Sequence, residues 1–133
     1  MTLKKAYITF FTLITICTLT FISCNRKEKK ADRLQKFNTE LWRKDKNGCF
    51  GDRLKLKNTF LSIRHNLRGF KSSEIESLLG KPDAQELYNR SQRYYIYFLD
   101  PGPKCQNAKS NPQALFVRFS AVGIANEFTI KAR

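Results

Sequence analysis

The spacing of apolar residues changes once along this chain, at residues 80–82, and this change restricts the folds that are open to it. Before that point, residues 34–42 and 54–67 carry apolar side chains at mostly helical spacing. After it, the pattern becomes extended, and the short apolar and aromatic runs 93–99 and 114–120 are typical of strands. Helices followed by strands predict an α+β domain with two or three helices on an antiparallel sheet of three or four strands.

The helix that ends at this change has the clearest boundaries. Ile75, Leu78 and Leu79 form its inward stripe, and Ser73 with Glu76 matches a capping box. Gly80 followed by Pro82 ends the helix. We therefore predict a helix of about two turns that leads directly into the sheet.

Two further strands are predicted at 85–89 and 124–131, the second of which follows a tight turn around Gly123. The strand at 93–99 (RYYIYFL) is rich in aromatic residues. We interpret aromatic side chains at strand positions as core and sheet-face packing rather than as a platform for a ligand.

The first 24 residues have the organisation of an export signal that ends in a cysteine. Lys4 and Lys5 precede the uncharged run 6–22, which is shorter than the ~20 residues that a spanning helix needs. The run ends in Phe-Ile-Ser23-Cys24, which resembles the lipobox of bacterial lipoproteins. This resemblance implies cleavage between Ser23 and Cys24 and attachment of lipid to the Cys24 thiol. The alternative is an uncleaved signal anchor with an incidental cysteine.

The mature protein would be small and strongly basic. Only two of the 25 basic residues and none of the 11 acidic ones precede Cys24, so its net charge is 23 − 11 = +12. A basic tether follows the cysteine and contains Arg26, Lys27, Lys29, Lys30 and Arg33. Each basic residue near an anionic membrane contributes about 1 kcal/mol to binding. We expect the tether to contact anionic headgroups or to act as a solvated spacer, and we expect no nucleic-acid partner for an exported protein.

The remaining cysteines predict a disulfide. Cys49 and Cys105 are an even pair in an oxidising compartment. A bridge between them would close a loop of about 57 residues and remove roughly 4 kcal/mol of unfolded-state entropy in the chain-entropy model. Two cysteines and one histidine do not make a convincing metal site. We interpret Asp45 and Arg53 as a structural pair that brackets the Cys49 turn.

The sequence offers little for catalysis, and we expect neither an enzyme nor a cofactor. His65 lies between two arginines in a helical stretch, without an identifiable partner. A Cys49–His65 nucleophile pair is formally possible, but a disulfide to Cys105 would remove the thiol. The sequence contains no Gly-rich phosphate loop, serine elbow or metal-ligand spacing.

The segment GFKSSEIESLLGKP resembles the signature of the SmpA/OmlA (BamE-like) family of small bacterial lipoproteins, and the sequence before it resembles related lipoproteins of the Bacteroidetes type. The matching residues are Gly69, Ile75, Leu78, Leu79, Gly80 and Pro82. The resemblance implies a domain at 34–133 that follows a signal peptide at 1–23 and a lipidated tether at 24–33. It also implies a two-layer fold without catalysis.

Proteins of this family support the insertion of β-barrels into the outer membrane. We therefore expect a lipid-anchored envelope protein, at the outer membrane and facing the periplasm, that scaffolds a protein partner. Two alternatives of a different class stay open. One is an inhibitor or ligand-binding lipoprotein of the same fold, because β-lactamase inhibitor proteins share this architecture and bind through the exposed sheet face. The other is a small thiol enzyme that uses Cys49.

Overall fold

The structure, a computed structural model, describes residue 34 and residues 37–133. The chain divides into two units, 1–35 and 36–133. The helical elements of the second unit are α2 (Thr39–Lys44), η1 (Lys46–Gly48), α3 (Asp52–Lys55), α4 (Lys57–Ile63), η2 (Arg64–Leu67) and α5 (Ser72–Leu79). Its strands are β1 (Ala84–Tyr88), β2 (Gln92–Phe98), β3 (Gln113–Phe119) and β4 (Ala125–Ala132). The predicted α+β class, with helices first and strands afterwards, is confirmed.

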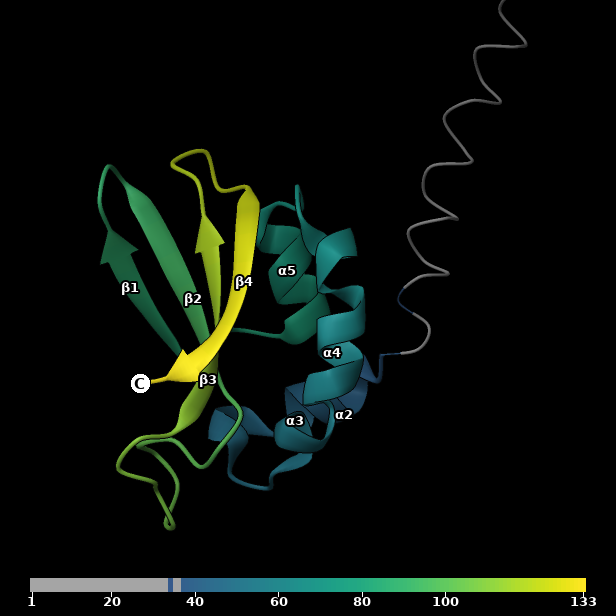
Figure 1. The fold of residues 1–133 in the computed structure, drawn as a ribbon, viewed down its shortest axis with the longest axis vertical. Coiled ribbons are helices and arrows are strands. Elements are labelled where there is room, and N and C mark those ends of the chain that lie inside the picture. Colours follow the sequence, from purple (N-terminus) through teal and green to yellow (C-terminus); the bar gives the residue numbers. More distant parts are fainter. Residues whose placement is uncertain (1–33, 35–36) are drawn as a thin grey trace, which may run out of the picture. The chain divides into compact units, whose positions relative to one another are not determined.

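The four strands form an antiparallel sheet in the order β1-β2-β3-β4, and the helices cover one face of it (Figure 1). The central strands place Ile96 opposite Phe116, and β1 places Ala84 beside Ile96. A bulge between Arg118 and Phe119 shifts the register with β4. β1 and β4 are the two edges of the sheet.

The core between the layers is aromatic. Trp42 from α2 stacks on Phe60 from α4 with 5.4 Å between ring centroids, and Phe60 lies 6.0 Å from Phe128 of β4. Ile75 and Leu79 from α5 are completely buried against the same sheet face. The helical layer is therefore joined to the sheet by side chains from α2, α4 and α5.

The sheet is also bonded to the C-terminal end of α5. Tyr97 is buried, and its hydroxyl donates to the carbonyl of Gly80 at 3.0 Å. Burial raises the pKa of this phenol, so it keeps the proton that it donates. The stop predicted at Gly80 and Pro82 is confirmed, because α5 ends at Leu79 and Gly80 has a φ of +80°.

The capping box predicted at Ser73 and Glu76 is wrong by two residues. The N-cap is Lys71, whose backbone N–H donates to the Glu74 carboxylate at 2.8 Å. The cause is tertiary: Gly69 N–H donates to the carbonyl of Ala125 at 2.9 Å, and Lys71 forms a bridge with the residue before β4. This pairing fixes the chain before α5 and thus the residue at which the helix can begin.

The buried face of α5 contains fewer residues than predicted, because Leu78 is only half-buried while Ile75 and Leu79 are fully buried. The first predicted helix starts later than residue 34, at Thr39, where the Asn38 side chain accepts the Leu41 N–H at 2.9 Å. The helical stretch predicted at 54–67 is three short segments, α3, α4 and η2. Within residues 34 and 37–133, no helix has the length and apolar character required to cross a bilayer.

Candidate binding surface

A buried arginine connects the helical layer to the sheet. Arg53, with 1% of its surface exposed, lies between the rings of Trp42 and Tyr97, at 5.5 and 5.6 Å from their centroids. Its guanidinium pairs with the carboxylate of Asp83 and donates to the carbonyls of Trp42 at 3.0 Å and Phe98 at 3.3 Å. A buried charge with this many partners is compensated, and its role is structural.

The predicted pair of Asp45 and Arg53 exists, but on the arginine side it is formed by the backbone. The Asp45 carboxylate accepts the backbone N–H of Arg53 and of Phe50, each at 2.8 Å. The Arg53 side chain turns instead to Asp83, which also accepts the N–H of Asn47 at 3.1 Å. The sequence does not point to Asp83, because it lies 30 residues from Arg53 and follows a Lys-Pro pair that carries no signal of a buried partner.

The same region contains the predicted disulfide between Cys49 and Cys105, whose Cα atoms are 5.4 Å apart. The turn before Cys49 packs tightly against the end of β2. Gly48 has a φ of +67°, and a Cβ there would lie 2.6 Å from the carbonyl oxygen of Asp100. Only glycine fits this position, so the Asn-Gly turn and the bridge together fix the loop against the sheet.

The sheet face away from the helices is largely covered by side chains of the sheet itself. Lys131 Nζ lies 4.4 Å from the ring centroid of Phe116, and Arg133 lies 5.6 Å from that of Phe98. Arg133 also pairs with Glu86 of β1 at 2.6 Å. Phe98 and Phe116 are consequently buried, as expected for packing residues. Tyr88 at the edge is the exception, with 47% of its surface exposed.

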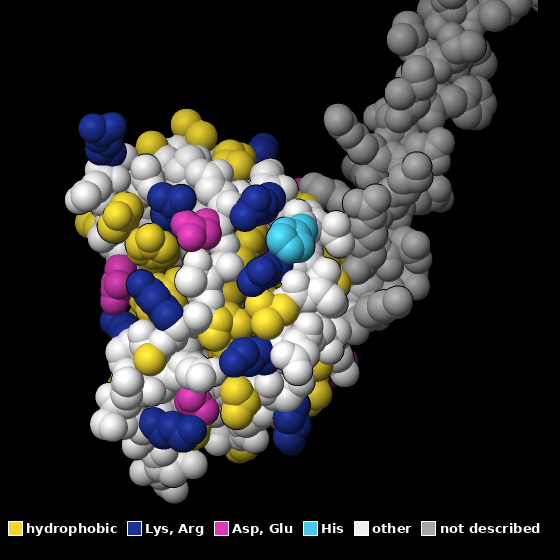
Figure 2. Space-filling model, in the orientation of Figure 1, with side chains coloured by type: hydrophobic (Ala, Val, Ile, Leu, Met, Phe, Trp, Pro, Cys, Tyr) yellow, Lys and Arg dark blue, Asp and Glu magenta, His cyan; other side chains and the backbone are white. Residues whose placement is uncertain are grey.

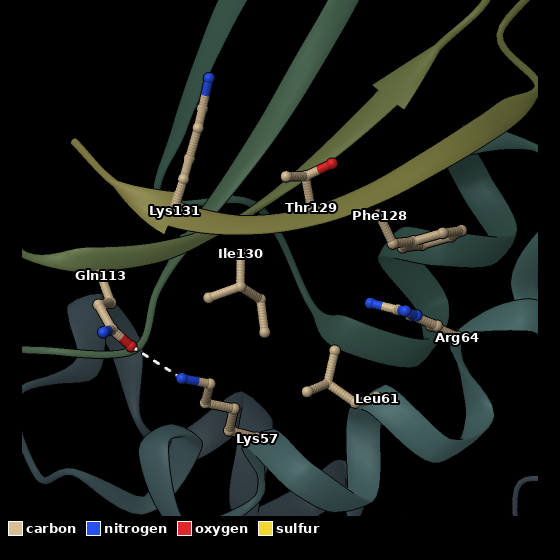
Figure 3. Close-up of a pocket in the computed structure, with 8 residues that line it drawn as sticks. All are labelled: Lys57, Leu61, Arg64, Gln113, Phe128, Thr129, Ile130 and Lys131. Atoms are coloured by element: carbon tan, nitrogen blue, oxygen red, sulfur yellow. Dashed lines mark hydrogen bonds between the residues drawn. The ribbon is translucent and has the colours of Figure 1, made fainter.

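The described residues include an open groove of about 420 Å³ between α4 and β4. Leu61 from α4 and Ile130 from β4 point toward one another across it, and Phe128 lies beside Arg64 (Figure 3). Lys57 stands at the opposite end, where its ammonium donates to the side chain of Gln113 at 3.0 Å. On the face in Figure 2, hydrophobic side chains are visible between basic ones over this part of the molecule.

The spacing along the helical segment explains how a short stretch can line the groove. Lys57, Leu61 and Arg64 are separated by four and then three residues, so they lie on one face of this segment. Along β4, Phe128 and Ile130 point to the helical side, whereas Thr129 and Lys131 point to the other side (Figure 3). The groove therefore has an apolar floor with a cation at each end.

In the part of the chain that the structure describes, the backbone of β4 has polar groups beside this floor that bond to no other strand. The carbonyl of Gln113 accepts the backbone N–H of Leu99, the residue after β2, at 2.9 Å, so Gln113 faces β2. The next residue of β3, Ala114, therefore faces β4, where it lies opposite Lys131. In an antiparallel pair, only every second residue faces its neighbour. Lys131 and Thr129 thus bond to β3, and the backbone N–H and C=O groups of Phe128 and Ile130 point outward, toward the groove.

Charge around the groove is of one sign. Its eight lining residues include Lys57, Arg64 and Lys131 and no acidic residue. The nearby carboxylates have partners of their own: Asp100 pairs with Lys109 at 2.8 Å, and Glu127 with Arg118 at 2.9 Å. Over residues 37–133 the sequence has 17 basic and nine acidic residues, a difference of 17 − 9 = +8. An anionic ligand is thus favoured both locally and by the whole domain.

The residues of the predicted family motif are not a site. Ile75 and Leu79 are buried core, Gly80 ends α5, and Gly69 starts the bridge to β4. Their roles are those of helix placement. The predicted lipidation and cleavage residues and the basic tether lie outside the described residues: Ser23, Cys24, Arg26, Lys27, Lys29, Lys30 and Arg33.

The Cys49 sulfur, which the thiol-enzyme alternative would use as its nucleophile, is bonded to Cys105. His65 is exposed in η2. Within the described part of the chain, no three His, Cys, Asp or Glu side chains gather to form a metal site.

The sequence does not single out the groove, because its two sides come from residues 57–64 and 128–131. The helical spacing of α4 and the alternation of β4 are each visible in the sequence. Their meeting depends on how the helical layer lies across the sheet. Comparison with known proteins adds no constraint: no family model, curated protein or solved structure matches this chain.

Proposed function

We propose that this protein is a lipid-anchored, non-catalytic binding module of the bacterial cell envelope. The anchor is Cys24, which follows an apolar run too short to span a bilayer comfortably and precedes a fully polar segment. One acyl chain binds a membrane only marginally, whereas the two or three chains of a lipoprotein anchor it stably. The disulfide in the domain is consistent with an oxidising compartment outside the cytoplasm.

The observation that carries the binding role is the groove between α4 and β4. It combines an apolar floor at Leu61 and Ile130, cations at Lys57 and Arg64, and outward backbone groups on β4. Surfaces with apolar contact, directional hydrogen bonds and a consistent charge are suited to recognition. Catalysis is not needed to account for any of these features.

The specific role that we propose is that of a scaffold in outer-membrane protein assembly, at the periplasmic side of the outer membrane. This role rests on the resemblance to SmpA/OmlA proteins. The tether at 24–33 supports it, because five cations next to the anchor would hold the domain close to anionic headgroups. The partner is then an envelope protein that meets the domain at the membrane surface.

The second candidate is an inhibitor or ligand-binding lipoprotein of the same fold. The exposed edge of the outer sheet face favours it: Tyr88 is about half exposed and lies 5.3 Å from the ring of Tyr94. Exposed tyrosines of this kind are common anchors in protein interfaces. The two candidates differ in which face of the sheet is occupied.

The experiment is photocrosslinking in living cells. A photoreactive phenylalanine analogue is placed at Leu61 in the groove, at Tyr88 on the outer face and at Val122, an exposed turn position that serves as the control. We expect a defined envelope-protein adduct from position 61 only, and we expect it to disappear when Cys24→Ala blocks lipid attachment and leaves an unprocessed precursor. An adduct from position 88 alone would favour the inhibitor, and equal adducts at all three positions would contradict a specific binding role.

A further inference from the structure

Within residues 34 and 37–133, the second half of β4 is a sheet edge with no neighbouring strand beyond it. The beginning of β4 is occupied, because Ala125 exchanges backbone hydrogen bonds with Gly69 and Phe70 at 2.9 and 2.8 Å. Beyond it, no backbone bond of the described residues outside the sheet involves Phe128 or Ile130. An exposed edge with free N–H and C=O groups is a template for another strand.

The helix α4 limits the space in which another strand can pair with this edge. α4 runs along β4 and presents Leu61 to Ile130, so a strand added to β4 would lie between the edge and the helix (Figure 3). Alternate side chains of that strand would point toward Leu61, and the others would lie on the face of Thr129 and Lys131. Binding of an extended peptide between an edge strand and a helix gives affinity from the backbone and selectivity from the side chains.

The basic residues of the groove favour an added strand that carries acidic side chains. On the helical side the groove ends are Lys57 and Arg64, which are seven residues and about 10 Å apart along a helix. Same-face residues of a strand recur about every 7 Å. Two acidic residues that flank one apolar residue on the same face are about 14 Å apart. With the apolar side chain over Leu61, each carboxylate would start only about 2 Å beyond a cation along the groove, a difference that a flexible Glu side chain can cover.

We propose that the β4–α4 groove binds an extended acidic segment of another protein as a fifth strand of the sheet. This inference rests on the proposed function, since it names the class of partner that the binding module takes. A second copy of this chain is a poor occupant, because its own edge presents the same cations and the domain has an excess of eight positive charges. Basic residues at an edge keep like chains away, and the same residues attract an acidic strand.

The test uses the full-length protein in neutral detergent and a fluorescent heptapeptide with blocked ends. In the peptide, threonines alternate with glutamate, valine and glutamate, in the order Thr-Glu-Thr-Val-Thr-Glu-Thr. We expect saturable binding by fluorescence anisotropy. The double variant Lys57→Glu, Arg64→Glu should bind at least about tenfold more weakly, because two attractions become repulsions. The control Lys81→Glu, Arg90→Glu has the same net charge and alters exposed residues outside the groove lining, so it should bind nearly as well as the wild type.

A second experiment distinguishes strand addition from charge attraction. It changes the peptide and uses the wild-type protein, so it does not depend on the folding of a variant. Two peptides are N-methylated, one at even positions and one at odd positions. Only every second amide of an added strand faces β4, so one of them should lose binding and the other should keep it. Equal binding by both peptides would overturn the proposal, as would a lack of binding by the unmodified peptide.

Two other outcomes would also overturn it in favour of a different occupant. A form without the lipid anchor, lacking residues 1–23 and carrying Cys24→Ser, serves for the lipid arm. Anionic vesicles that bind this form, but not its Lys57→Glu, Arg64→Glu variant, in the absence of peptide binding, would assign the groove to headgroups. A concentration-dependent dimer that this variant abolishes would assign it to a second copy. Failure of peptide binding while the position-61 adduct persists in cells would reject the acidic strand alone, whereas loss of the adduct itself would reject the binding role.

Discussion

Replacement of Arg53 by methionine is the most informative test of how the domain is held together. The substitution keeps an unbranched side chain between Trp42 and Tyr97 but removes the partner of a buried carboxylate. Breaking one side of a buried ion pair costs about 3–5 kcal/mol. Asp83 would keep two backbone donors, from Asn47 and Phe98, which moderates this cost. Two carbonyls would lose a hydrogen bond worth about 1 kcal/mol each, so we expect a loss of about 4 kcal/mol.

The assay is urea unfolding of a soluble form that lacks residues 1–23 and carries Cys24→Ser, followed by tryptophan fluorescence from Trp42 with the disulfide intact. Arg53→Met, Asp83→Asn and the double variant form a cycle in which coupled residues deviate from additivity by about 0.5–3 kcal/mol. The double variant should be less destabilised than the sum of the two single changes, because no lone buried charge remains. A loss below about 1 kcal/mol for Arg53→Met, or strict additivity, would refute the idea that this pair joins the two layers.

Three further predictions concern stability. Cys49→Ala should lower the free energy of unfolding by about 2–5 kcal/mol. Thiol titration of the denatured, unreduced wild-type protein should find neither Cys49 nor Cys105 free, and two free thiols would contradict the bridge. Leu79→Ala should lower the free energy of unfolding by about 2–5 kcal/mol in the same urea assay, whereas Leu78→Ala should lower it clearly less because this side chain is half-buried. Equal losses would contradict the conclusion that Leu78 lies outside the buried face of α5. Burial alone would raise the pKa of Asp100, but the hydrogen bonds from Lys109 and Gln113 outweigh it and lower that pKa below its ordinary value of 3.8. The stabilisation is therefore present above this value and is lost as the pH falls through the lower folded pKa, so Asp100→Asn should flatten the acid-unfolding profile below about pH 4; an unchanged profile would contradict it.

Much of the fold is predictable because its signals are local. Gly80 and Pro82 stop α5 by their own backbone chemistry, and the run rich in aromatic residues at 93–99 favours a strand. The disulfide follows from the number of cysteines and the predicted export signal. The first two inferences use residues whose structural effect does not depend on distant parts of the chain, and the disulfide requires only that one pair of cysteines remains.

The features that sequence patterns miss depend on contacts between distant segments. The start of α5 is set by pairing of residues 69–71 with the chain that leads into β4, which overrides the local capping box at Ser73. Arg53 pairs with Asp83 rather than with the nearer Asp45, because the sheet brings Asp83 to the buried guanidinium. The groove likewise exists only when α4 lies along β4. Local chemistry predicts the elements, and packing decides which of them meet.

The measurement that tests the central claim most directly is intact-mass and N-terminal analysis of the protein isolated from membranes of a bacterium that expresses it. An envelope lipoprotein should begin at Cys24, lack residues 1–23 and carry the added mass of a diacylglyceryl group on that cysteine. Cys24→Ala should accumulate as an unprocessed precursor without lipid. A wild-type chain that retains Met1 to Ser23, or that begins at any residue other than Cys24, would contradict the lipoprotein assignment.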